Sequence, residues 1–220
     1  SINNITDIIL KLVLFIINVA PYGIFCLMSV LFAEKGITVL GDLSFYFFVV
    51  VFALLLHGFL TYSLFLVLFI KVNPLKFFNK IKSLMLFAFS TSSSNATIPV
   101  TLKTVVDDIG VSRKIASFTV PLGATINMDG TAIMQGVATV FIANAYSIDL
   151  SFADYLMVIL IATLASIGTA GVPGVGLIML AMVLDQVGLP VEGIALIIGV
   201  DRLLDMLSLI HISEPTRLGA

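Results

Sequence analysis

Asp129 is the residue of this chain most able to do chemistry, because it lies deep inside a long hydrophobic stretch as part of Asn127-Met128-Asp129-Gly130-Thr131. An ionised side chain near the middle of a bilayer costs about 2.5–3.5 kcal/mol on insertion scales, so it is normally paired, protonated or bound to an ion. Asn127, Thr131 and carbonyls freed near Gly130 are hard oxygen donors that suit an alkali cation. We expect a cation site here. The alternative is an Asp that is hydrogen-bonded to a neighbouring helix for structure alone.

Two short polar segments, residues 90–99 and 168–176, interrupt otherwise hydrophobic sequence. Irregular backbone at membrane depth is tolerated only against protein or a water-filled cavity, since each unsatisfied peptide group in hydrocarbon costs several kcal/mol. Paired interruptions of this kind indicate the substrate site of a secondary transporter. The hydroxyls and exposed backbone N–H groups of the first segment suit a carboxylate, because the start of a half-helix carries partial positive charge.

A third polar group lies near the end of the chain. Asp201 and Asp205 are four residues apart and therefore share one face of a helix. Arg202 lies three residues before Asp205, so these two side chains can pair. The functional interpretation is a charged stripe that faces a substrate cavity, and the alternative is an internal ion pair at a helix end. The sequence leaves both open.

The composition is that of an integral membrane protein. Sixty per cent of the residues are hydrophobic, the mean hydropathy is +1.17, and 11% are charged, against about 25% in soluble domains. The few basic residues lie in short loops rather than in a patch, so we expect no nucleic-acid partner. The sequence has no phosphate loop, no Cys/His metal spacing and no Gly-x-Ser-x-Gly elbow. We predict a multi-pass protein of the cell membrane that is not an enzyme.

Hydrophobic runs of roughly 20 residues predict the membrane segments. They lie at residues 8–33, 43–70, 84–102, 115–150 and 155–184, and a last run starts near Gly193. The loops at 71–82 and 103–114 carry Lys and Arg, whereas those at 149–154 and 185–192 carry neither, which places the first two on the cytoplasmic side. The predicted class is therefore an all-α membrane protein with two re-entrant hairpins of opposite orientation. The alternative is that each hairpin is one kinked spanning helix.

The two hairpin tips also resemble each other, residues 95–99 against 169–173, which supports an inverted repeat. Four motifs follow in order: Ser-Ser-Ser-Asn-Ala-Thr-Ile-Pro at 92–99, Pro-Leu-Gly-Ala-Thr-Ile-Asn-Met-Asp-Gly-Thr at 121–131, Ala-Ser-Ile-Gly-Thr-Ala-Gly-Val-Pro-Gly at 165–174 and Asp-Arg-Leu-Leu-Asp-Met at 201–206. With these motifs the chain resembles the dicarboxylate/amino acid:cation symporters, the glutamate and aspartate transporter family, from about residue 8 to 206.

The resemblance implies a homotrimer whose subunits each have a scaffold part and a moving transport part. Residues 1–70 would be two transmembrane helices, and residues 75–206 the transport core. Within that core the resemblance implies an inner hairpin at 75–102, a helix at 112–148, an outer hairpin at 153–185 and the start of the last helix at 193–206. The first four helices of the family would be absent, so the chain is expected to be a C-terminal fragment.

The resemblance also implies the site residues, motif by motif. The substrate contacts would be Ser93, Ser94, Thr131, Val172, Gly176 and Asp205, with Asp205 receiving an amino group. The sodium contacts would be Gly123 with Asn127 at one site, Asn127 with Asp129 at a second, and Thr125, Ser166, Ile167 and Thr169 at a third. The third site would couple ion to substrate, because closing the outer hairpin over both lets each raise the apparent affinity of the other.

The chain departs from the family pattern after Met206. An Arg that reads a side-chain carboxylate would fall at Ser208, and a Thr would fall at Leu209. The residues that follow are similar to a translated sequencing adapter, and we expect residues 207–220 to be a non-native tail. Arg202 lies at a different helix position and is not assigned the role of that Arg.

These observations predict a sodium-coupled symporter of an acidic amino acid (glutamate or aspartate) or a C4 dicarboxylate, with the proton as the alternative ion. The outer hairpin would close over ions and substrate, and the transport part would then cross the membrane as a block. A neutral amino acid symporter is the alternative within the family. A channel, a membrane-embedded enzyme and an inactive truncated fragment are the remaining alternatives, and ion flux without accumulation, or turnover without translocation, would indicate the first two.

Overall fold

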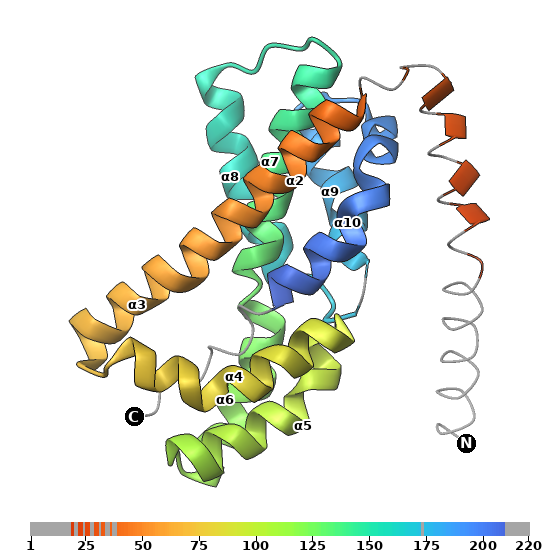
Figure 1. Ribbon diagram of the computed structural model, residues 1–220. Helices are drawn as coiled ribbons and strands as arrows, with labels where there is room; N and C mark the ends of the chain where they lie inside the picture. The colour runs from red at the N-terminus through yellow and green to blue at the C-terminus, as the bar shows by residue number, and fades with distance from the viewer. Residues whose placement is uncertain are drawn as a thin grey trace, which may run out of the picture.

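The computed structural model describes residues 39–172 and 174–209, together with scattered positions between 19 and 36. This part of the chain is built of helices and contains no strand, which confirms the all-α class (Figure 1). The span predicted at 8–33 and residues 210–220 of the predicted tail lie outside the continuously described residues.

The first fully described element is one long helical rod, Leu40–Ile70, and it contains the predicted span at 43–70. It comprises α2 (Val39–Leu55) from its second residue on, the π-helical turn η1 (Leu56–Thr61), α3 (Tyr62–Phe65) and a second π-helical turn, η2 (Leu66–Ile70). Its 31 residues exceed the roughly 20 that cross a hydrocarbon core. It is the one helix of that length and apolarity in the described ranges.

The two sides of α2 differ in what they meet. Its buried side consists of Leu43, Tyr46, Val50 and Leu54, and its exposed side includes Phe45, Phe48 and Phe52. Both sets follow the spacing of three and four residues that puts side chains on one helical face. Large aromatic side chains that face outward are compatible with lipid, where close packing and not water exclusion holds helices together.

The first predicted hairpin is a pair of packed helices, α4 (Pro74–Thr91) and α5 (Ser94–Thr104). Asn73 starts α4 by accepting hydrogen bonds from the amides of Leu75 and Lys76. The turn between the helices is formed by Ser92, with a φ of 48°, and Ser93, which caps α5. The chain leaves α5 through the π-helical turn η3 (Val105–Ile109). The serine segment therefore forms the bend of a helical hairpin, while its re-entry into a membrane stays a prediction.

The segment predicted as one helix at 112–148 is divided into two. Helix α6 (Arg113–Ile126) ends before Asn127, and α7 (Asp129–Ala145) begins two residues later. Asn127 and Met128 leave helical geometry, with ψ angles of 74° and 46°. Such a break leaves carbonyl groups at the end of α6 without partners inside the helix. The sequence prediction put weakened helix and free carbonyls at Gly130, and the structure puts the interruption just before Asp129.

The second predicted hairpin is the pair α8 (Phe152–Ile167) and α9 (Val175–Gln186), which pack against each other. The glycine-rich segment joins them, and Gly174 takes a φ of 79° at the start of α9. A short 3-10 turn, η4 (Val191–Gly193), then leads into α10 (Ile194–Ser208).

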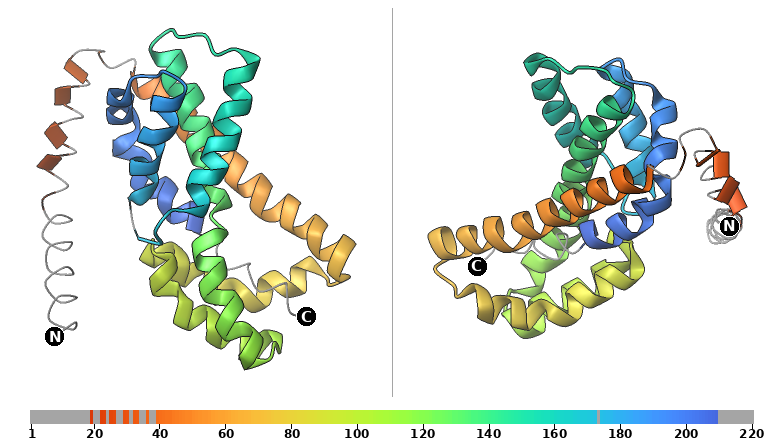
Figure 2. Two further views of the ribbon diagram at one scale, coloured as in Figure 1. Left: turned by 180° about the vertical axis from the view of Figure 1, so that it is seen from behind. Right: turned by 45° about the horizontal axis from the view of Figure 1, so that its top comes forward.

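One hydrophobic core unites α2, α7, α8, α9 and α10. Its fully buried members include Val50, Met134, Ile142, Leu180 and Ile197. The hairpin of α4 and α5 lies at one end of this bundle together with α6, and the loop between α8 and α9 points toward it (Figure 2). The fold thus brings the serine segment and the glycine segment to one place.

The start of α8 gives a pH-dependent test of local structure. The hydroxyl and the amide of Ser151 both donate to Oδ2 of Asp154, at 2.7 and 2.8 Å. The side-chain hydrogen bond, followed by the backbone one, holds the pKa of Asp154 below its ordinary value. Because the folded-state pKa is the lower one, these bonds stabilise the fold above the ordinary pKa, and their contribution is lost as the pH falls through the folded-state pKa.

Replacing Ser151 with Ala is therefore expected to raise the pKa of Asp154, because one of the two stabilising donors is removed. The shift can be followed by NMR titration of carbon-13-labelled Asp side chains. Ser112→Ala is the matched control, since Ser112 precedes α6 but makes no side-chain capping bond. An unchanged Asp154 pKa in the Ser151 variant would contradict the statement that the Ser151 hydroxyl lowers that pKa.

Candidate substrate and cation sites

The tips of the two helical hairpins touch each other. Ser93 donates its hydroxyl hydrogen to the carbonyl of Gly171 at 2.8 Å, and the amide of Asn95 donates to the same carbonyl at 3.3 Å. Gly171 has no room for a side chain, because a Cβ there would lie 2.8 Å from Cβ of Ser94. Segments nearly 80 residues apart are thereby held in direct contact through backbone and serine groups.

A small hollow lies under the joined tips. Its volume is about 10 Å³, which is roughly the space of one water molecule. It is lined by Ser92, Ser94, Met128, Thr131, Thr169, Ala170, Gly171, Val172, Gly176, Asp205 and Leu209. Five of the six predicted substrate residues therefore line one hollow, namely Ser94, Thr131, Val172, Gly176 and Asp205. Ser93 does not line it, since its hydroxyl is turned to Gly171.

The polar groups around this hollow can bind a ligand that carries both a negative and a positive group. The hydroxyls of Ser92 and Ser94 are buried without a hydrogen-bond partner. An unsatisfied buried donor costs about 1–3 kcal/mol, so a group that accepts hydrogen bonds here would be favoured. On the other side, the Asp205 carboxylate accepts one hydrogen bond, from the amide of Gly174 at 3.1 Å. The serine hydroxyls can donate hydrogen bonds to a ligand carboxylate, and the Asp205 carboxylate can accept them from a ligand amino group.

The structure places the three members of the polar group on α10 in different surroundings. Among the described residues, Arg202 forms no ion pair with Asp205, and its side chain is exposed. Asp205 is buried and lines the hollow under the tips, while its role toward a substrate stays a prediction. Asp201 is buried as well, and its Oδ1 atom lacks a hydrogen-bond partner.

Asp129 lies at the start of α7, where three side chains converge on its carboxylate. The hydroxyl of Tyr62 donates to Oδ2 at 2.9 Å, and Nε2 of His57 lies 3.4 Å from the same atom. With its amide nitrogen turned to Asp129, Asn127 donates to Oδ2 at 3.1 Å and to Oδ1 at 3.2 Å. The helix break before Asp129 is what allows Asn127 to reach it.

This carboxylate faces a larger hollow of about 730 Å³ between the rod of α2 and α3 and helices α6, α7 and α8. Five of the seven predicted sodium residues line it: Gly123, Asn127, Asp129, Ser166 and Ile167. Thr125 and Thr169 do not, because their hydroxyls donate to the carbonyls of Pro121 and Ala165 in the preceding helical turn. Thr169 instead lines the hollow under the tips.

The donors around Asp129 fit a hard monovalent cation. No group of three or more His, Cys, Asp or Glu residues capable of holding a metal occurs in the described part of the chain. The lining offers one carboxylate, an amide, hydroxyls and carbonyls at a helix end, together with a single imidazole, that of His57. Oxygen donors with a single formal charge suit an alkali ion, whereas transition metals prefer imidazole and thiolate.

Comparison with known proteins agrees with this chemistry. A family model described as "Sodium:dicarboxylate symporter family" matches residues 1–209. The chain belongs to this family. It is 41% identical over 202 residues to an excitatory amino acid transporter of Caenorhabditis elegans, which covers 90% of this chain and 40% of that protein. It is 39% identical over 205 residues to excitatory amino acid transporter 2 of Mus musculus, covering 92% of this chain and 36% of the relative.

A human relative, excitatory amino acid transporter 5, is 40% identical over 203 residues, which cover 91% of this chain and 36% of that protein. The chain therefore spans about two fifths of the length of these relatives. The predicted family is confirmed, and with it the expectation of a membrane transporter family. The position of this stretch within a longer protein stays a prediction.

Sequence reasoning on this symporter-family chain missed the partners of Asp129. His57 was assigned no role, and Tyr62 was not considered, because each lies about 70 residues away in the chain. The available signal was that both are polar side chains within an apolar rod, five residues apart. Only the fold shows that this part of the rod faces α7.

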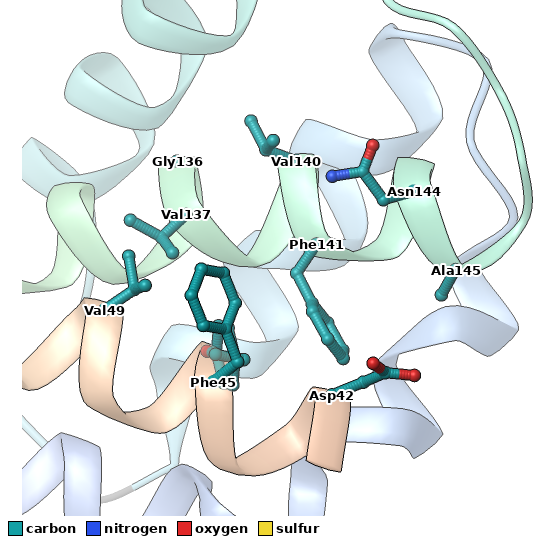
Figure 3. Close-up of a pocket in the computed structure, with 10 residues that line it drawn as sticks. Asp42, Phe45, Val49, Gly136, Val137, Val140, Phe141, Asn144 and Ala145 are labelled. Atoms are coloured by element: carbon teal, nitrogen blue, oxygen red, sulfur yellow. The ribbon is translucent and has the colours of Figure 1, made fainter. Parts of the chain in front are cut away.

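A further hollow of about 600 Å³, between α2 and α7, was also not foreseen (Figure 3). Phe45 points from α2 toward α7, and Phe141 points from α7 toward α2. Asp42 and Asn144 stand at one end, and the remaining lining is largely apolar. None of the predicted site residues lines this hollow, so it belongs to neither candidate site.

Proposed function

We propose that the intact protein is a sodium-coupled symporter of an acidic amino acid or a C4 dicarboxylate. The observation that carries the proposal is the contact of Gly171 with Ser93 and Asn95 above a hollow that Asp205 lines. Membership of the sodium:dicarboxylate symporter family supports the ion and the substrate class. The relatives' names, excitatory amino acid transporters, favour glutamate or aspartate.

The substrate would lie in the hollow under the hairpin tips. Ser93 and Ser94 would hold a substrate carboxylate through hydroxyl and backbone groups, and Asp205 would receive the amino group. Thr131 on α7 would add a side-chain contact, and Val172 and Gly176 would add backbone contacts. The hollow of about 10 Å³ is too small for an amino acid, so binding requires the tips to separate at Gly171.

Sodium would bind next to the substrate at the break between α6 and α7. Gly123 with Asn127 would form one site there, and Asn127 with Asp129 a second. A third site would use the carbonyl-rich end of α8, at Ser166, Ile167 and Thr169, with Thr125 from α6. Because the segment after α8 carries Gly171, an ion bound there would favour the tip contact, which couples ion occupancy to substrate affinity.

Transport would proceed by an elevator movement. The hairpin of α8 and α9 would act as the gate, closing over substrate and sodium, and the hairpins together with α6, α7 and α10 would then move through the membrane as one block. The protein would do so as a homotrimer in the cell membrane, without an enzymatic step. Re-entrant hairpins of opposite orientation are part of this proposal, since each face of the membrane needs its own gate.

One observation favours a neutral amino acid as the second candidate substrate. Leu209 lines the hollow, and Ser208 lies beside it on α10. By the resemblance these positions correspond to a Thr and to the Arg that reads a side-chain carboxylate. Neither Ser208 nor Leu209, both of which fall in the predicted non-native tail, supplies a positive charge for a second acidic group.

The test is uptake of radiolabelled L-aspartate by proteoliposomes that contain the intact protein. We expect accumulation only with an inward sodium gradient, and inhibition by excess L-glutamate but not by L-serine. Uptake that requires a proton gradient and ignores sodium would overturn the sodium assignment. Inhibition by L-serine, with no response to L-glutamate, would replace the acidic substrate by a neutral one.

A further inference from the structure

A charged pocket of about 570 Å³ lies away from both candidate sites, between α5, η3 and α6. Its rim carries Lys103, Asp107 and Arg113, and its floor includes Leu102 and Val106. The floor is firmly held, because Leu102 and Val106 pack against a small buried cluster that contains Val105 and Val111. The pocket thus joins a charged opening to an apolar base, and its volume falls in the range of about 300–1,000 Å³ that is typical of small-molecule sites.

The two cations of the rim are available for a ligand. Lys103 and Arg113 are exposed, and neither forms an ion pair within the part of the chain that the structure describes. Asp107 on the same rim leaves a net charge of +1. The fork of an Arg guanidinium binds a phosphate through two parallel hydrogen bonds, while a Lys ammonium acts as a compact point charge.

The surroundings of the pocket are basic as well. Seven of the chain's eleven Lys and Arg residues lie between positions 71 and 114, against two acids, Asp107 and Asp108. Lys80 of α4 donates to the backbone carbonyl of Asp108 at 2.7 Å, which brings the basic α4 helix to this end of the molecule. Basic loops of membrane proteins lie on the cytoplasmic side, where the lipid surface carries negative charge.

We propose that this pocket binds the headgroup of an anionic membrane phospholipid. Arg113 and Lys103 would hold the phosphate, and the glycerol and first acyl carbons would lie on Leu102 and Val106. Asp107 can only accept hydrogen bonds when ionised, so it favours a headgroup that also carries hydroxyl donors beside the phosphate. Phosphatidylglycerol meets all three requirements. A free phosphate ester meets only the first and third, because it has no apolar part for the floor.

Binding can be measured on the purified full chain in detergent by native mass spectrometry. Dioctanoyl phosphatidylglycerol is the probe, and dioctanoyl phosphatidylcholine and glycerol 3-phosphate are the comparisons that separate acyl chain from headgroup. We expect saturable binding of phosphatidylglycerol, with both comparisons bound at least about tenfold more weakly. Equal binding of glycerol 3-phosphate would mean a site for soluble phosphate esters, and equal binding of phosphatidylcholine would mean adsorption of acyl chains. Either result would overturn the proposal.

The matched variants test the location. Each basic residue near an anionic lipid contributes about fivefold in affinity, so Lys103→Gln with Arg113→Gln is expected to weaken phosphatidylglycerol binding by about 25-fold. Lys76→Gln with Lys82→Gln removes the same charge from exposed positions of α4 that do not line the pocket, and less than about threefold weakening is expected. An equal loss of phosphatidylglycerol affinity in both double variants would mean that the lipid responds only to the overall positive charge, and it would refute a specific site in the pocket.

A variant that keeps the positive charge at position 113 separates loss of lipid binding from loss of the fold. Arg113→Lys retains the positive charge but cannot form the two parallel hydrogen bonds of a guanidinium, so we expect phosphatidylglycerol binding weaker than that of the unchanged protein but stronger than that of Arg113→Gln, with unchanged helical circular dichroism. Unchanged affinity in Arg113→Lys together with unchanged affinity in the double Gln variant would exclude a role for this rim.

Discussion

Replacing Asp129 with Asn is expected to lower the apparent sodium affinity of L-aspartate uptake by about 100-fold. Among the described residues that line the hollow between the rod and helices α6 to α8, Asp129 is the only acid. Its loss would remove the single formal charge that offsets a bound cation, and a hydrogen bond or contact to a charged group is worth about 1.5–3 kcal/mol. Each 1.4 kcal/mol corresponds to tenfold in affinity, which gives the stated size.

The measurement is the sodium concentration that gives half-maximal uptake in proteoliposomes containing the intact protein. Asp149→Asn is the matched control, because Asp149 is an exposed acid after the end of α7 and lines neither candidate site. Tyr62→Phe should have an intermediate effect, since it removes one donor that positions the Asp129 carboxylate. A variant at Asp129 with the sodium dependence of the Asp149 control would refute the cation site.

The sequence made the polar parts of the fold predictable, because they stand out against hydrophobic surroundings. The serine segment, the glycine segment and Asp129 are each local interruptions of an apolar run. Such an interruption is tolerated at membrane depth only where it meets protein or a water-filled cavity. Their order also identified the family. The hairpin formed by α4 and α5, and the pair of α8 and α9, accordingly occur close to the predicted boundaries.

Contacts between distant segments could not be predicted in this way. His57 and Tyr62 meet Asp129 only because the rod packs next to α7, and no pattern in the sequence marks that pairing. Thr125 and Thr169 illustrate a second limit. A Thr in a helix can donate to the carbonyl four residues earlier, and both hydroxyls do so here, which turns them away from the hollow around Asp129.

The break between α6 and α7 is an intermediate case. The sequence Asn127-Met128-Asp129-Gly130 contains a poor helix former at each end but no proline, so the sequence predicts one helix that is weakened at Gly130 rather than two separate helices. In the structure the break lets the Asn127 amide reach the Asp129 carboxylate, at 3.1 and 3.2 Å. A tertiary and functional arrangement thus overrides local propensity, as is common where a site is built from backbone groups.

A close approach of α7 and α10 leads to the second prediction of large effect, at Gly130. A Cβ at this position would lie 2.6 Å from the backbone carbonyl oxygen of Ser208 and 2.9 Å from its Cα. Backbone atoms cannot move aside as a flexible side chain does, so Gly130→Ala would force the two helices apart. Overpacking of this kind typically costs about 1–3 kcal/mol, which exceeds the gain of up to about 1 kcal/mol in helix propensity.

Gly136→Ala is the matched control, because Gly136 lies in the same helix and a Cβ there meets nothing within 4 Å. The melting temperature in detergent should fall for Gly130→Ala and stay equal or rise for Gly136→Ala. The functional consequence follows from what the two helices carry. Thr131 is on α7 and Asp205 is on α10, and both line the hollow under the tips. Separating the helices should therefore weaken L-aspartate binding in the Gly130 variant alone, and equal behaviour of the two variants would show that the close packing of α7 on α10 does not shape the substrate site.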